Sequence, residues 1–423
     1  MSKKKSPLTI FIAIAAAAMI GTFSGKETSL WGVSLYAAFD LLGTLYIKAL
    51  TLVVVPLVSS CIITGIGRLG SEKTFGKLGL KTFSFYIGTS LLAILVGLLF
   101  VNLITPGSML DQATTQATLQ LEHSSSIHPS VNIDISSVLL QIIPSNIVEA
   151  FSSGQMLGLI FFSSLFGYAM SKIDTAFSST LMSFCQGVFQ TMIQVTHVIM
   201  KCLPLGVFCL VAKAFAATGL GSLHSLLLFL LTVLLSLSAY LFIALPLLLK
   251  FVGKVNPWRH FKAMSPALIT AFSTSSSSAT LPITIDCVEK RAGVSNRICS
   301  LVVPLGTSIN MSGSALYECV AAMFVAQAYG IELSFSTQFI VVFMALITSI
   351  GVAGIPSGSL VAIIVILKTL GLPAEGIGLF LAVDRILDMC RTTVNVFSDS
   401  CCAVLVARSE GEQEVLSKTA YTS

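Results

Sequence analysis

Charged residues are scarce in this chain of 423 residues. They make up 10% of the sequence, hydrophobic residues make up 55%, and the mean hydropathy is +0.92. Soluble domains carry about 25% charged residues and roughly 45 to 50% apolar ones. The composition therefore excludes an ordinary soluble domain and predicts a multi-spanning membrane protein. At about 20 residues for each spanning helix, the chain has room for about eight to ten spans.

Metal-ligand patterns are also lacking. The 10 cysteines form no C-x-x-C pair, most of them lie in apolar runs, and the five histidines are scattered. A thiol in an apolar run behaves as a small hydrophobe, so the sequence does not support a cysteine or histidine metal site. The net charge of +5 does not indicate nucleic-acid binding, because the basic residues lie in short clusters between apolar segments.

Three basic clusters indicate which loops are cytoplasmic. They lie before the first apolar run, between the second and third, and after a leucine-rich run: Lys3, Lys4, Lys5; Arg68, Lys73, Lys77, Lys81; Lys250, Lys254, Arg259, Lys262. The stretch 105–136 contains three acidic residues and no Lys or Arg. By the positive-inside rule we expect that stretch outside and both termini in the cytoplasm. The apolar run that starts at Leu8 could imitate a signal peptide, but we expect an uncleaved first helix.

Six apolar blocks predict the spanning helices of the first 250 or so residues. They cover 8–23, 35–66, 80–104, 142–170, 181–215 and 226–251. Several are longer than a bilayer is thick, which predicts tilted or protruding helices rather than additional spans.

Polar residues interrupt the apolar segments of the C-terminal part at three places. The interruptions are Ser275-Ser-Ser-Ser-Ala-Thr-Leu-Pro282, Asn310-Met-Ser-Gly-Ser314 and Gly354-Ile-Pro-Ser-Gly358. Serine hydroxyls compete for backbone hydrogen bonds and proline removes a donor, so we expect helix breaks there. The freed backbone groups must line a cavity or pack in protein, as in re-entrant hairpins. Two such breaks in corresponding places are typical of secondary transporters with inverted repeats.

A polar helix face lies near the C-terminus. Its members fall within a wedge of about 100° at helical spacing: Asp388, Arg391, Thr392, Asn395 and Asp399. An ionised side chain at the centre of a spanning helix costs about 2.5 to 3.5 kcal/mol, so such a cluster faces protein or an aqueous pathway. We expect a binding site within the membrane. The alternatives are a structural Asp388–Arg391 ion pair and, for the serine tract, a small-residue face for helix packing.

These motifs resemble the dicarboxylate/amino acid:cation symporters, the family of the glutamate and aspartate transporters. The resemblance covers nearly the whole chain, from Val53-Val-Val-Pro-Leu to Arg408, and includes the three interruptions and the polar helix in the family's order. It implies an all-α polytopic membrane protein with eight transmembrane helices, two re-entrant helical hairpins and inverted repeats. It also implies a homotrimer that works by an elevator mechanism.

The resemblance further implies a scaffold and a mobile transport domain. The scaffold comprises 1–78 (spans 1 and 2) and 106–218 (the outer loop with spans 4 and 5). The transport domain comprises 79–105 (span 3) and 219–410 (span 6, hairpin 1, span 7, hairpin 2 and span 8), and 411–423 is a cytoplasmic tail.

An acidic amino acid is the substrate that the resemblance implies. Arg391 then pairs with the side-chain carboxylate through two charge-assisted hydrogen bonds, Asp388 accepts the α-ammonium group, and Asn395 helps to hold the α-carboxylate. The expected substrate-binding residues are Ser275, Ser277, Ser314, Ile355, Ser359, Asp388, Arg391, Thr392 and Asn395. Asp384 and Arg385 are interpreted as a solvated pair facing the aqueous pathway and are not assigned to the substrate.

Sodium ions are the co-transported cations that the resemblance implies. One site uses the carbonyl of Gly306 with Asn310, Asn395 and Asp399; a second uses carbonyls near Ser308, Ser349 and Ile350; a third uses Tyr86, Thr89, Ser90 and Asn310. The family's third site also has an aspartate where this chain has Ser312, so we expect that site to be weakened or absent. Val352 replaces a common threonine, although its carbonyl remains available.

Glu318 is a candidate proton carrier. Proton-coupled vertebrate relatives also have glutamate at this place in Ala315-Leu-Tyr-Glu318, whereas some sodium-only archaeal ones have glutamine. A buried carboxyl group can carry a proton together with the substrate. The alternative is a structural glutamate that bonds to a neighbouring helix.

The expected function is secondary active import of L-glutamate or L-aspartate coupled to sodium, with protons as a further candidate, and no enzyme activity is expected. The alternative is a neutral amino acid or C4-dicarboxylate symporter of the same family, against which Arg391 and Asp388 together argue. An intramembrane hydrolase is disfavoured because Asp384 and Asp388 lie on one helix and no G-x-G-D motif accompanies them. The expected partners are the substrate, the lipid bilayer and further copies of the chain, without nucleic acid. The compact outer loop and short tails suggest a multi-pass protein of a bacterial plasma membrane.

Overall fold

Helices make up nearly all of the computed structural model. It describes residues 16–17, 19–25, 28–30, 33–70, 76–109, 143–153, 156–218, 222–351, 358–373, 376–377 and 380–416. Within these residues the strands are limited to β1 (Ser29–Leu30) and β2 (Val33–Ser34), which pair antiparallel. The prediction of a mostly helical chain is confirmed.

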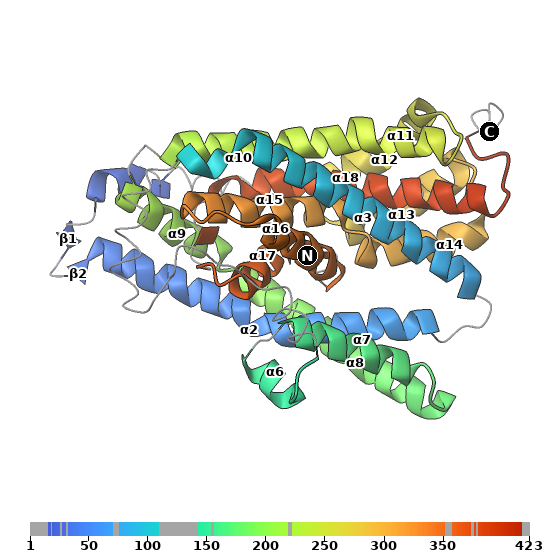
Figure 1. Ribbon diagram of the computed structural model, residues 1–423, viewed down its shortest axis with the longest axis horizontal. Coiled ribbons are helices and arrows are strands. Elements are labelled where there is room, and N and C mark those ends of the chain that lie inside the picture. Colours follow the sequence, from blue (N-terminus) through green and yellow to red (C-terminus); the bar gives the residue numbers. More distant parts are fainter. Residues whose placement is uncertain are drawn as a thin grey trace.

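One group of helices packs around the long helix α2 (Leu35–Gly70). The helices α7 (Met156–Met170), α8 (Thr175–Met200) and α9 (Leu203–Thr218) all contact it, and the short α6 (Ile147–Ser153) contacts α7. Figure 1 shows α2, α7 and α8 along one long side of the molecule. The ring of Tyr46 on α2 lies against the backbone of Gly206 on α9, where a Cβ atom has no room. The glycine therefore allows these two helices to approach closely.

A second group of helices surrounds α15 (Ser312–Ala328). Nearly all side chains of α15 are buried, including that of Glu318. Its neighbours are α3 (Gly76–Ile104), α10 (Ser222–Ala239), α16 (Phe335–Gly351), α17 (Gly358–Thr369), α18 (Leu381–Ser409) and the 3-10 turn η1 (Pro106–Met109). The remaining elements are the π-helical turn η3 (Tyr240–Ala244), α11 (Leu245–Phe251), α12 (Pro257–Thr274), α13 (Ser277–Asp286), the π-helical turn η4 (Cys287–Arg291) and α14 (Asn296–Ile309).

The apolar block 181–215 consists of two helices rather than one. The helix α8 ends at Met200, a turn follows at Lys201 and Cys202, and α9 begins at Leu203. The expectation that excess length is absorbed by tilt or protrusion is therefore wrong for this block, because a helix break divides it. The block 226–251 does form one continuous stretch, running from α10 through η3 into α11.

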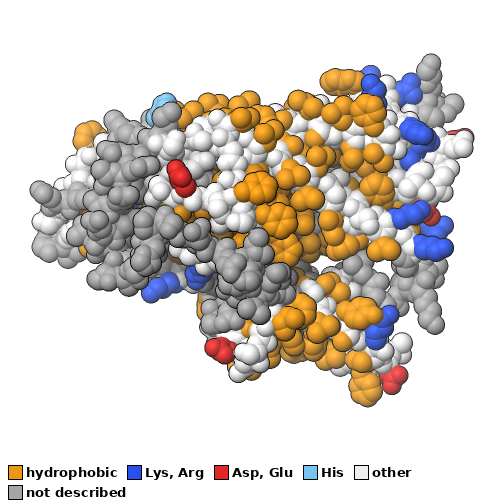
Figure 2. Space-filling view, in the orientation of Figure 1, with side chains coloured by type: hydrophobic (Ala, Val, Ile, Leu, Met, Phe, Trp, Pro, Cys, Tyr) orange, Lys and Arg blue, Asp and Glu red, His pale blue; other side chains and the backbone are white. Residues whose placement is uncertain are grey.

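The surface is that of a membrane protein. Three helical stretches of the described residues are long and apolar enough to cross a membrane: Lys77–Ser108, His224–Phe251 and Asn296–Ala328. Figure 2 shows hydrophobic side chains spread over the middle of one face. It also shows several Lys and Arg side chains grouped at the end of the molecule where the C-terminus lies. Basic residues at one end of an apolar surface match the charge distribution of a polytopic protein.

Candidate functional site

The serine tract breaks a helix beside α18. The helix α12 ends at Thr274, Ser275 adopts a left-handed conformation with φ 50° and ψ 37°, and α13 begins at Ser277. The Ser276 hydroxyl caps α13 by accepting a hydrogen bond from the Ala279 amide at 3.3 Å. The side chains of Ser275 and Ser277 are buried, and α13 packs against α18. The predicted break is confirmed, and it brings both serines near the polar helix.

A second break separates α14 from α15. The helix α14 ends at Ile309, Asn310 and Met311 have non-helical backbone angles, and α15 begins at Ser312. The predicted interruption at Asn310 is thus confirmed. It leaves the first amides of α15 without carbonyl partners in their own helix, and these amides lie against α18.

The Asn395 side chain of α18 accepts hydrogen bonds from the first backbone amides of α15. Its Oδ1 accepts hydrogen bonds from the amide of Gly313 at 2.8 Å and from that of Ser314 at 3.3 Å. Its Nδ2 donates to the hydroxyl of Ser314 at 3.1 Å and contacts the Met311 sulfur at 3.3 Å. A Cβ atom on Gly313 would lie 3.0 Å from the carbonyl oxygen of Arg391. The absence of a side chain at Gly313 therefore allows α15 to approach α18 closely. Two predicted site residues, Ser314 and Asn395, are therefore in direct contact.

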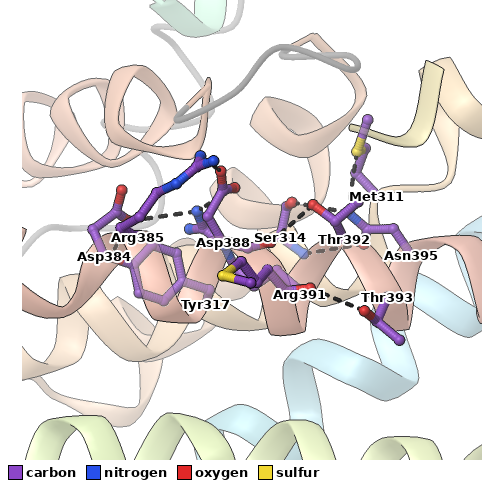
Figure 3. A network of polar contacts seen from close by, with 11 residues as sticks. Met311, Ser314, Tyr317, Asp384, Arg385, Asp388, Arg391, Thr392, Thr393 and Asn395 are labelled. Carbon is purple, nitrogen blue, oxygen red and sulfur yellow. Dashed lines mark hydrogen bonds and ion pairs between the residues drawn. The ribbon is translucent and has the colours of Figure 1, made fainter. Parts of the chain in front are cut away.

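Arg391 is buried, and Asp388 and Asp384 on its own helix pair with it. Its Nη2 lies 2.9 Å from Asp388 Oδ1 and 3.4 Å from Asp384 Oδ1. The guanidinium also lies over the ring of Tyr317 on α15, with its carbon 4.0 Å from the ring centre, and Figure 3 shows these side chains together along α18. Only 1% of the Arg391 surface is exposed, and its Nε and Nη1 have no hydrogen-bond partner among the described residues. A buried cation with unused donors is able to bind an anionic ligand.

Asp384 belongs to this network and is not part of a solvated pair. It is 4% exposed, and the Tyr317 hydroxyl donates a hydrogen bond to its Oδ1 at 2.9 Å. Arg385 instead approaches Asp388 Oδ2, at 3.4 Å. The interpretation of Asp384 and Arg385 as a pair facing the aqueous pathway is therefore wrong. Helical spacing could have found Asp384, since a residue two turns before Arg391 falls in the same 100° wedge.

Asp399 and Asn310 form the centre of a second polar cluster. The Nδ2 of Asn310 donates to Asp399 Oδ1 at 2.9 Å, and its Oδ1 accepts hydrogen bonds from Thr89 at 3.1 Å and Ser90 at 3.3 Å. Asp399 is 1% exposed, and its Oδ2 has no hydrogen-bond partner within the described part of the chain. A Cβ atom on Gly306 would lie 2.8 Å from this carboxylate, so only glycine fits beside it. Carboxylate, amide and hydroxyl oxygens are hard donors suited to a small cation.

Tyr86 is a predicted cation ligand, and Ser312 stands where the resemblance implies an aspartate; both are buried in the same region. The Tyr86 hydroxyl donates to the carbonyl oxygen of Val302 at 2.5 Å. Ser312 is fully buried at the first position of α15 and brings a hydroxyl group instead of a carboxylate. Among the described residues no group of three or more His, Cys, Asp and Glu side chains could hold a metal ion. Tyr86 and Ser312 thus bring hydroxyl groups, which are uncharged donors, to this region.

Glu318 is fully buried one turn after Ser314 on α15. Its Oε2 accepts a hydrogen bond from the Thr348 hydroxyl of α16 at 2.9 Å. Ser359, at the start of α17, is also buried, and α17 contacts α15. The carboxyl group therefore lies between α15 and the two helices that flank the second predicted hairpin break.

The other predicted site residues are Thr392, Ser349, Ile350, Ser308 and Ile355. Thr392 is buried and donates to the Asp388 carbonyl oxygen at 2.8 Å. Ser349 is buried and donates to the Leu346 carbonyl oxygen at 2.9 Å, and Ile350 follows it near the end of α16. Ser308 lies in α14, while its side chain is outside the described part. The Gly354 break, with Ile355 and Val352, falls in 352–357, which is outside the described residues.

Comparisons with known proteins find the same relationship over most of the chain. A model of the sodium:dicarboxylate symporter family matches residues 7–409. The chain is 35% identical over 380 residues to the proton/sodium-glutamate symport protein of Bacillus caldotenax, covering 88% of this chain and 87% of that protein. It is 34% identical over 381 residues to the proton/glutamate-aspartate symporter of Escherichia coli strain K12, covering 90% and 87%. It is 31% identical over 372 residues to the C4-dicarboxylate transport protein of Bacillus subtilis strain 168, covering 88% and 87%.

Proposed function

Because the chain belongs to the sodium:dicarboxylate symporter family, we propose that it is a secondary active symporter that imports L-glutamate or L-aspartate together with sodium ions. The observation that carries this proposal is the buried Arg391, whose Nε and Nη1 lack partners among the described residues. A buried guanidinium with free N–H donors favours a carboxylate ligand, since its planar donors match the planar carboxylate oxygens. The names of two relatives, a glutamate symport protein and a glutamate-aspartate symporter, support the same substrate class.

Three residues of α18 supply the complementary groups for an acidic amino acid. Arg391 binds the side-chain carboxylate, Asp388 accepts the α-ammonium group, and Asn395 contributes to the α-carboxylate site. In the ligand-free arrangement Arg391 pairs with Asp388 at 2.9 Å and with Asp384 at 3.4 Å. When the substrate binds, its side-chain carboxylate replaces Asp388 beside Arg391 and its ammonium group pairs with Asp388, while Asp384 keeps the hydrogen bond from Tyr317. The exchange limits the cost of desolvating the two charges, because neither is left unpaired.

Asp399 supplies the charge for a sodium site. Its Oδ2 is buried without a hydrogen-bond partner among the described residues, and an uncompensated buried carboxylate is costly unless a cation accompanies it. The Gly306 backbone lies beside it and adds a neutral carbonyl ligand. Asn310 now donates its Nδ2 to Asp399 Oδ1, and in our proposal it turns its Oδ1 toward the bound ion. The co-transported sodium offsets the net negative charge of the substrate. Each net positive charge that moves inward contributes about 2.3 kcal/mol per 100 mV of membrane potential.

Proton coupling is assigned to Glu318, which is buried beside Thr348 and one turn from Ser314. Two bacterial relatives are named proton/sodium-glutamate symport proteins, which fits a carrier that uses both ions. The third sodium site is weakened in our proposal, because Ser312 replaces its carboxylate. The proton carried on Glu318 then moves a positive charge inward in place of the third sodium ion.

Transport itself is proposed to occur by relative movement of two helix groups. In this proposal α3 and α10 to α18 carry the substrate past a scaffold of α2 and α7 to α9, and three copies assemble in the plasma membrane. The contacts of α16 and α17 with α2, and of α18 with α9, are the surfaces that slide. Light scattering on the purified protein tests the assembly: a mass other than that of three chains refutes the trimer.

Uptake by proteoliposomes tests the proposed function. Labelled L-aspartate and L-glutamate are offered under an inward sodium gradient with the internal pH held equal to the external pH. We expect uptake of at least one of the two, with the label recovered chemically unchanged. No uptake of either acid, with or without an added proton gradient, would refute the proposal.

A C4-dicarboxylate carrier is the second candidate, because one relative is named a C4-dicarboxylate transport protein. Succinate has no ammonium group to pair with Asp388, which then keeps only the longer contact with Arg385 at 3.4 Å. We therefore expect succinate to compete poorly with labelled aspartate. Strong competition by succinate, together with weak competition by glutamate, would favour this second candidate.

A further inference from the structure

A groove with a volume of about 740 Å³ lies where α11 meets α12. Figure 1 places these helices near the C-terminal end of the molecule. Its walls carry large apolar side chains, namely Phe242, Ile243, Leu247 and Trp258. They are between 47% and 75% exposed. Such a groove favours an apolar occupant.

The rim of the groove is basic. Lys250 at the end of α11 and Lys254 in the following turn both line it and are exposed. Neither has a carboxylate within ion-pair distance among the described residues. The 18-residue helix α12 begins at the same rim, where the Asn256 side chain accepts a hydrogen bond from the Trp258 amide. The rim therefore combines two uncompensated lysines with the positive end of a helix dipole.

Contacts between aromatic rings hold the walls of the groove in place. Phe242 stacks on Phe261 with ring centres 5.7 Å apart, and Trp258 lies 5.9 Å from the same ring. Phe261 in turn stacks at 4.1 Å on Phe397 of α18. The interlocked rings make the groove a preformed feature of the fold, so a ligand does not have to open it.

We propose that this groove binds one anionic phospholipid, with an acyl chain along the apolar walls and the phosphate between Lys250 and Lys254. The apolar walls fit a hydrocarbon chain, and the lysines fit a negative headgroup at the membrane surface. An exposed tryptophan beside lysines is typical of the interface between membrane and water. A soluble anion would use the lysines alone and leave the walls exposed. The proposal does not depend on which substrate is carried, because Lys250, Lys254 and Trp258 are not among the proposed substrate ligands.

The fluorescence of Trp258 provides a direct test. The chain has two tryptophans, so a Trp31→Phe variant of the full chain leaves Trp258 as the single reporter. The variant is reconstituted in phosphatidylcholine bilayers that contain increasing fractions of lipid with brominated acyl chains, which quench tryptophan on contact. Brominated phosphatidylglycerol is compared with brominated phosphatidylcholine. A basic residue near the surface favours an anionic lipid by about five-fold, so two lysines predict half-quenching at a roughly 25-fold lower fraction of phosphatidylglycerol.

Charge variants separate the groove from general surface charge. In the Trp31→Phe background, Lys250→Gln with Lys254→Gln should remove most of the preference for phosphatidylglycerol. The control Lys172→Gln with Lys290→Gln changes the net charge equally at two exposed lysines outside the groove, and it should keep the preference. Equal quenching by both lipids in the parent, or quenching by neither, would overturn the proposal. An equal loss of preference in the control and the groove variant would also overturn it.

Discussion

Replacing Arg391 with cysteine should convert an acidic-substrate carrier into one that prefers small neutral amino acids. The guanidinium is 1% exposed, so solvent screens its interactions little. Its Nε and Nη1 have no partner in the described part of the chain and are the donors available to a carboxylate. Hydrogen bonds to charged groups contribute about 1.5 to 3 kcal/mol each. Two such bonds amount to about 3 kcal/mol at the lower end, which corresponds to a loss of about 100-fold in apparent affinity for aspartate.

The assay for Arg391→Cys is uptake of labelled aspartate, glutamate, serine and alanine by proteoliposomes. Arg391→Lys serves as a second variant, since it keeps the charge but loses the planar donors, and it should retain part of the acidic preference. Thr393→Cys is the matched control, because its hydroxyl donates to the Met389 carbonyl oxygen and its side chain lies off the polar face. Aspartate uptake by Arg391→Cys within about three-fold of the parent would refute the assignment of Arg391 to the side-chain carboxylate.

The cation assignments lead to three further predictions. Asp399→Asn should raise the sodium concentration for half-maximal uptake by ten-fold or more, about 1.4 kcal/mol, and an unchanged sodium titration would exclude Asp399 as a ligand. Ser312→Asp should steepen the dependence of uptake on sodium if the third site lacks only its carboxylate; the same steepness in parent and variant would contradict that reading. Glu318→Gln should make aspartate uptake insensitive to an imposed proton gradient while sodium-driven uptake continues, whereas a retained proton response would leave Glu318 as a structural residue bonded to Thr348.

The helix breaks of the site were predictable from sequence because their causes are local. The serine tract and the Asn310 segment carry side chains that compete with their own backbone, and both break helices where expected. The polar face of α18 follows from helical spacing alone. The division of the block 181–215 also had a local signal that the apolar pattern hid, since Pro204 stands in the first turn of α9.

The contacts between distant segments were not predictable in the same way. The Tyr317 hydroxyl reaches Asp384 across 67 residues of sequence, and periodicity on α15 gives no sign that one ring will lie beneath Arg391. Nor does the sequence indicate that the Thr348 hydroxyl of the next helix, α16, donates a hydrogen bond to Glu318. These contacts depend on how α15, α16 and α18 pack, which a pattern within one helix does not determine.

Calorimetric binding of L-aspartate to the purified protein tests the central claim most directly. Heats are compared for aspartate, serine and succinate, each with and without sodium at constant ionic strength. The arrangement of Asp388, Arg391 and Asp399 predicts that aspartate binds well only with sodium, and that serine and succinate bind at least ten-fold more weakly. Equal binding of aspartate with and without sodium, or binding of succinate as tight as that of aspartate, would contradict it.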